Sequence, residues 1–142
     1  MTQEEKSLLL KDLSARLSYG IICQVDDGAA GLNDGKLVEI DISKELVRFD
    51  ADYYWDAWID DIKPYLRPMS YMTEEEEYEY HQYKNNNNLE IFNQEHHEII
   101  KATALVFSNA IDWLLAHHFD FRGLIEKGLA IEVTKENNPY EN

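Results

Sequence analysis

The chain has 142 residues, and its 13 Lys and Arg stand against 28 Asp and Glu, which gives a formal net charge of −15 at neutral pH. This length predicts one domain over residues 1–142, and a hydrophobic content of 44 % is enough for a packed core. The acidity argues against direct binding to nucleic acid, because such binding depends mainly on clustered Lys and Arg. For the same reason it argues against binding to an anionic membrane surface.

Residues 1–71 predict an N-terminal helix followed by a small antiparallel β meander. Thr2 and Glu5 have the spacing of a capping box, and the apolar helical stripe that follows ends at Gly20, a residue type suited to a helix end. Alternating apolar positions predict the strands of the meander. These strands are expected over residues 21–25, 36–42 and 45–49.

Two further segments of this half lack a regular pattern. Residues 26–35 contain three glycines but match no phosphate-binding pattern, so an ordinary loop is predicted. Residues 62–69 contain two prolines, which favour an extended connector or edge strand over a helix.

Residues 72–142 predict a mainly helical half. Thr73 and Glu76 form a second capping box. The helix that they begin is expected to reach about Lys84, before a run of four asparagines that reads as a polar linker.

A second, longer helix is predicted from Leu89, because an apolar stripe recurs at helical spacing as far as His117. This helix is expected to be central to the core, and the polar side chains within residues 99–116 predict a buried helix and not a membrane span. A last strand over residues 129–133 and a frayed tail over residues 135–142 complete the chain. The sequence thus predicts the α+β class, with an N-terminal helix, a small antiparallel β meander, and a helical C-terminal half with a short last strand.

The lone cysteine, Cys23, lies in an apolar strand-like run, which predicts a buried structural thiol. Residues 1–6 are acidic and lack an apolar core, so no signal peptide is expected there. Both features predict a cytoplasmic protein without disulfides.

Three segments carry a resemblance. They are residues 63–76 (KPYLRPMSYMTEEE), residues 112–130 (DWLLAHHFDFRGLIEKGLA) and the opening residues 8–13 (LLLKDL). In these segments the chain resembles small acidic proteins carried by gut Bacteroidota, often within prophages and other mobile elements. The resemblance implies a phage or mobile-element setting, and it implies no activity and no catalytic residue.

Histidines are the candidate metal ligands. In a metal-dependent hydrolase, His81, His96 or His117 would bind the metal with a nearby carboxylate, but no three ligands have the spacing of a known zinc site. On one continuous helix His96 and His117 would stand about 30 Å apart. No metal or other cofactor is therefore expected. His117 is instead predicted to satisfy carbonyl groups at a helix end, and Asp120 to cap the turn that follows.

Aromatic residues are concentrated in residues 49–71, where seven occur. Tyr and Trp are enriched at recognition surfaces, so part of this cluster is a candidate partner-binding patch. The patch would consist of Tyr53, Tyr54, Trp55 and Trp58.

The function that these observations favour is a non-enzymatic protein-interaction module encoded by a phage or mobile element. It would bind a host or phage protein, for which a basic surface would suit the acidity of this chain. Two alternatives are a metal-dependent hydrolase and an acidic nucleic-acid mimic that inhibits a DNA-binding host protein. The sequence predicts no oligomeric state.

Overall fold

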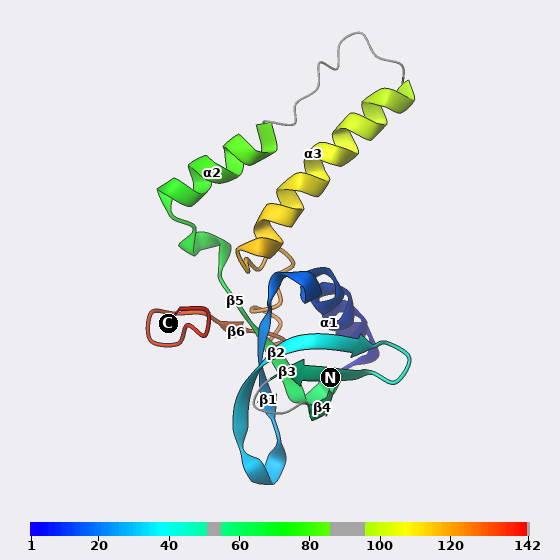
Figure 1. The fold of residues 1–142 in the computed structure, drawn as a ribbon, viewed down its shortest axis with the longest axis vertical. Helices are drawn as coiled ribbons and strands as arrows, with labels where there is room; N and C mark the ends of the chain where they lie inside the picture. The colour runs from blue at the N-terminus through cyan, green and yellow to red at the C-terminus, as the bar shows by residue number, and fades with distance from the viewer. Residues whose placement is uncertain (51–54, 86–95, 142) are drawn as a thin grey trace.

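The computed structural model describes residues 1–50, 55–85 and 96–141, and it confirms the predicted α+β class (Figure 1). Both predicted capping boxes are present. The Glu5 N–H donates to Thr2 Oγ1 and the Thr2 N–H to Glu5 Oε1, and the Thr73 and Glu76 pair does the same. The helices are α1 (Gln3–Arg16), α2 (Glu74–Asn85) and α3 (His96–Ala116). The strands are β1 (Ile22–Asp26), β2 (Leu32–Asp41), β3 (Leu46–Asp50), β4 (Trp55–Trp58), β5 (Ile62–Leu66) and β6 (Ile131–Glu132).

The strands form one sheet in the order β4-β3-β2-β1-β5-β6, antiparallel except for the β5–β6 pair. In a flat sheet β4 and β5 would stand about 19 Å apart, four strand spacings. Only the 3-10 turn Ile59–Asp61 joins them, and a connection of that length spans at most about 14 Å. The sheet must therefore curl, and a register shift in β2 between Leu37 and Glu39 helps it to bend.

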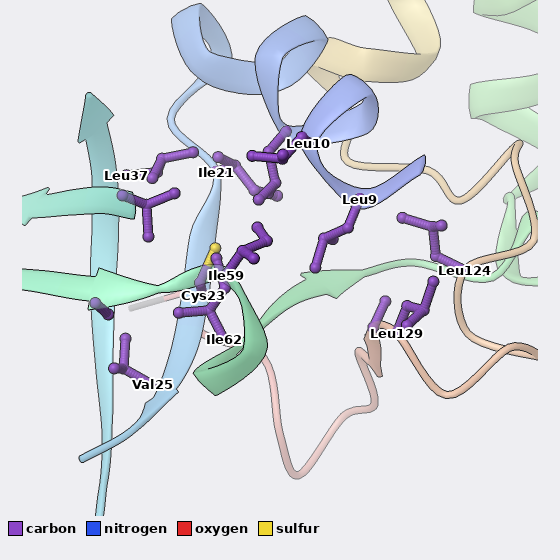
Figure 2. Close-up of a cluster of buried hydrophobic side chains, with 14 of the residues drawn as sticks. Leu9, Leu10, Ile21, Cys23, Val25, Leu37, Ile59, Ile62, Leu124 and Leu129 are labelled. Carbon is purple, nitrogen blue, oxygen red and sulfur yellow. The ribbon is translucent and has the colours of Figure 1, made fainter. Parts of the chain in front are cut away.

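The main core lies between this curled sheet and α1 (Figure 2). Leu9 and Leu13 of α1 are fully buried against Cys23 of β1 and Ile62 of β5. Leu124, from the segment after α3, closes the same cluster. The N-terminal helix, the meander and the C-terminal segment therefore share one core.

The loop predicted over residues 26–35 is shorter in the structure. β2 begins at Leu32, and β1 pairs with it from Asp26 opposite Leu32 to Ile22 opposite Lys36. The prediction was wrong for residues 32–35 because this end of β2 projects from the core. Its first three residues, Leu32 included, are exposed, so no apolar alternation marks the strand.

Helices α2 and α3 form an arm that projects from the curled sheet (Figure 1). The arm joins the rest of the molecule through a small second core of Trp113, Leu114 and Phe119, against which Tyr80 packs. The prediction that α3 is central to the core was therefore wrong. Its buried side chains are confined to Ala102, Ala110 and the last turn, residues 113–115.

By length and composition alone, α3 could cross a membrane, but the same is true of many helices in soluble proteins. Of the apolar stretch of α3 that meets this criterion, 28 % is buried in the structure. The first residues of the predicted helix, from Leu89 to residue 95, lie outside the described part of the chain.

The C-terminal segment follows α3 back along the sheet, where β6 pairs with β5. Residues 135–142 were predicted to fray, and within the described part of this tail Tyr140 is anchored. Its hydroxyl group donates to the Tyr65 carbonyl oxygen at 2.8 Å and accepts the Ile22 N–H at 3.1 Å.

Candidate functional site

The predicted metal ligands lie on separate parts of the arm. His81 is exposed on α2, His96 is the exposed first residue of α3, and His117 follows the last residue of that helix. Within residues 1–50, 55–85 and 96–141 no group of three or more His, Cys, Asp or Glu side chains could hold a metal ion. The hydrolase alternative thus gains no support from the geometry.

His117 has the structural role that the sequence predicted. Its Nδ1 lies 2.8 Å from the Trp113 carbonyl oxygen at the end of α3, and its ring stacks on the Trp113 ring at 3.9 Å. Its Nε2 lies 3.8 Å from a carboxylate oxygen of Glu79. Asp120 also caps the following turn as predicted, because its carboxylate accepts the N–H groups of Leu124 and Ile125.

Cys23 is fully buried in the core, which confirms the predicted structural thiol. Burial raises the pKa of the Cys23 thiol above its ordinary value. The thiol therefore stays protonated at neutral pH and is a poor nucleophile.

The predicted aromatic patch is only partly described. Tyr53 and Tyr54 lie outside the described residues, and for Trp55 the structure describes the backbone in β4. Trp58, at the end of this edge strand, is 57 % exposed. Binding through this patch stays a prediction.

A buried charge cluster connects α1 to the C-terminal segment. Arg16 donates two hydrogen bonds to Asp12, at 2.7 and 3.2 Å, and neither side chain is exposed. Arg122 donates to the same carboxylate at 3.1 Å, and Arg16 also donates to the Phe119 carbonyl oxygen at 2.8 Å. Asp12 and Arg16 are four residues apart, which by itself indicates an ordinary pair on a helix surface. This pair differs from an ordinary surface pair because both side chains are buried, and the sequence pattern does not predict that burial.

A groove with a volume of about 950 Å³ lies where the segment from Arg67 to Glu76, the end of α3 and the C-terminal segment meet. We call it the His118 groove after a residue at which the backbone has φ = +63°. The His118 ring stacks on Tyr140 with a centroid distance of 3.8 Å. Sequence reasoning missed this groove, because its walls come from segments far apart in the chain. The adjacent pair His117 and His118 was the feature of the sequence that could have drawn attention to the groove.

An apolar stripe faces outward on α3. Ile100, Ala104, Phe107 and Ile111 follow one another at steps of four, three and four, which places them on one face of the helix, and all four are exposed. We call this stripe the outer face of α3. The periodicity that predicted the helix includes Ile100, Phe107 and Ile111, but it was taken as a sign of burial.

Comparisons with known proteins return no match, whether the chain is compared with protein families, with curated proteins or with solved structures. Within the part of the chain that the structure describes, the outer face of α3 and the His118 groove are candidate sites.

Proposed function

We propose that this protein is a non-enzymatic interaction module that docks a partner protein on the outer face of α3. The observation that carries the proposal is the exposure of large apolar side chains on a projecting arm. Ile100 is 69 % exposed and Phe107 is 58 % exposed. Contiguous exposed apolar surface of this kind marks interaction sites in soluble proteins, and an apolar stripe along a helix is a common docking element.

The charge of the arm indicates the kind of partner. Five of the twelve residues of α2 are acidic and one is basic, and the whole chain carries −15. A partner that presents an apolar patch bordered by Lys and Arg would gain both apolar burial and charge complementarity. A second copy of this chain would bring another −15, so self-association through this face would be opposed by repulsion.

The proposal also covers the genetic origin of the protein and its cellular compartment. The resemblance to proteins of gut Bacteroidota supports a phage or mobile-element origin and a host or phage protein as partner. The buried, reduced thiol of Cys23 suits the cytoplasm, where disulfides are rare. The net charge disfavours an anionic membrane as the occupant of the apolar face.

The test is capture of partners from a Bacteroidota lysate at low and high salt, read by quantitative mass spectrometry. The proposal predicts one stoichiometric partner that is lost with Phe107→Ser and weakened at high salt. The matched control is Ile42→Ser in the turn after β2, because Ile42 is 63 % exposed and lies away from the arm. Ile42→Ser should leave capture unchanged.

Other outcomes identify other occupants. Equal capture by the wild-type protein and by Phe107→Ser would overturn docking on α3. Competition by duplex DNA together with loss at high salt, but without sensitivity to Phe107→Ser, would point to the nucleic-acid mimic. Concentration-dependent dimers that Phe107→Ser abolishes would identify a second copy, and binding to neutral vesicles would identify a bilayer.

A further inference from the structure

Helix α3 has two apolar sides, and the described part of the chain covers one of them. Trp113 is buried and Tyr80 of α2 packs edge-on against its ring, while Ala102 is buried on the same side, three turns earlier. Ile100 and Ile111 each precede one of these buried residues by two positions, about 200° around a helix, and both are exposed. A helix that is apolar on opposite sides is normally buried between two layers.

The outer face of α3 has the repeat of a seam between two helices. Ile100, Ala104, Phe107, Ile111 and Leu114 follow one another at steps of four, three, four and three, which is the repeat by which one helix packs along another. Leu114 is buried in the second core, so this end of the repeat is already covered. From Ile100 to Ile111 the repeat is exposed over roughly 16 Å of helix, a length that a helix of three to four turns covers.

The surroundings of the outer face allow a second helix to come close. Thr103 and Ser108 border it on either side, and both are short and exposed. Ala104 lies between the larger Ile100 and Phe107, which leaves room for one side chain of a facing helix. Helix axes in such contacts stand about 8–10 Å apart. An extended peptide binds through free backbone groups at a sheet edge, and the interior of a helix offers none.

Charge indicates what the facing helix carries beside its apolar positions. Five of the twelve residues of α2 are acidic and one is basic, and α3 adds Glu98 and Asp112 against Lys101. The arm is therefore acidic, as the whole chain is. A helix with Lys and Arg beside its apolar positions complements the arm, whereas a second copy of this chain would bring another acidic arm.

We propose that the outer face of α3 receives a basic amphipathic α-helix of the partner, which makes α3 the middle helix of three. This inference rests on the function proposed above and names the element that the partner supplies. The apolar side chains of the partner helix recur at steps of three and four, and one of them fills the space at Ala104. Binding therefore depends on the shape of the outer face as well as on its apolar area.

The test uses a synthetic peptide of about 21 residues, or three heptads, with leucine at steps of three and four and with lysine and glutamine elsewhere. A control peptide of the same composition and charge has its leucines at every second position. The first peptide should bind saturably and gain helicity, as measured by fluorescence anisotropy and circular dichroism, and the control should bind about tenfold more weakly or less. The absence of saturable binding, or equal binding of both peptides, would overturn the proposal.

Two variants separate helix packing from adhesion to any apolar surface. Ala104→Trp adds apolar surface but fills the space between Ile100 and Phe107, so it should weaken peptide binding about tenfold or more. Leu105→Ser is the matched control, because Leu105 is exposed but lies outside the outer face, and it should bind as the wild-type protein does. Both positions are exposed, so both variants should fold, which circular dichroism checks. Unchanged or stronger binding by Ala104→Trp, or an equal loss with Leu105→Ser, would overturn the proposal.

The capture experiment described above distinguishes this inference from the proposed function. Capture that is lost with Phe107→Ser and with Ala104→Trp, and retained with Leu105→Ser, would support a helix as the docked element. Loss with Phe107→Ser but not with Ala104→Trp would overturn the helix and leave docking on α3 in place. Capture that Phe107→Ser leaves unchanged would overturn both.

Discussion

The two parts of this molecule use apolar residues in opposite ways. In the curled sheet with α1, the apolar positions of each element face a shared interior, as Leu9, Cys23 and Ile62 do. In the arm, α3 buries mainly the last turn, residues 113–115, and leaves Ile100 and Phe107 in solvent. The same residue types therefore stabilise the fold in one region and form a free surface in the other. A helical period indicates a helix in both regions, but it does not say what covers its apolar face.

The largest expected loss of stability comes from a substitution in the buried charge cluster of Asp12, Arg16 and Arg122. Asp12→Ala should leave Arg16 and Arg122 without their shared carboxylate and lower the free energy of unfolding by about 3–5 kcal/mol. Arg48→Met is the control, because its pairs with Glu39 and Asp56 are exposed and such pairs contribute less than about 1 kcal/mol. Urea denaturation monitored by circular dichroism measures both. Equal losses would mean that the burial of Asp12 has no energetic consequence.

The next largest effect is expected when a leucine is replaced by alanine in each of the two regions and the losses in the free energy of unfolding are compared. Leu13→Ala removes a fully buried side chain of α1 and should cost about 2–5 kcal/mol. Leu105→Ala, on the exposed part of α3, should change the free energy of unfolding by less than about 0.5 kcal/mol. The same denaturation experiment applies. A cost at Leu105 similar to that at Leu13 would show that the arm is covered in solution.

The smallest effect concerns pH and the groove between the two regions. The pKa of His118 is about 4 in the folded protein, below the ordinary value of 6.5, so the unfolded chain binds the proton more tightly. The His118 contribution is therefore complete above pH 6.5 and is lost as the pH falls toward 4, by about 3 kcal/mol at most. His118→Asn removes this dependence. The difference between the two pH profiles isolates His118 from carboxyl groups such as Glu76, and parallel profiles would contradict the assignment.

Local features could be predicted from the sequence. Both capping boxes, at Thr2 and at Thr73, involve residues three apart, and the structure contains both. The burial of Cys23 followed from its apolar neighbours.

Features that depend on distant residues could not be predicted. The first residues of β2 carry no apolar alternation because they lie beyond the core. Arg16 is buried where it donates a hydrogen bond to the carbonyl oxygen of Phe119, 103 residues away. The His118 groove likewise needs Tyr140, whose hydroxyl group bonds to β1 and β5. The outer face of α3 is exposed because the arm projects away from the curled sheet. The periodicity of the sequence does not predict the direction in which a helix projects.

The central claim is that the outer face of α3 is open to solvent in the free protein, whereas the core between the curled sheet and α1 is closed to it. Hydrogen–deuterium exchange of the free protein at low and high concentration, resolved by peptide, tests it most directly. We predict that residues 96–108 exchange much faster than β1 and β5 at both concentrations, because few buried contacts hold that part of α3. Slow exchange in residues 96–108 at both concentrations, or protection that appears only at high concentration, would contradict the claim and would mean that the face is already occupied, in the second case by another copy of the chain.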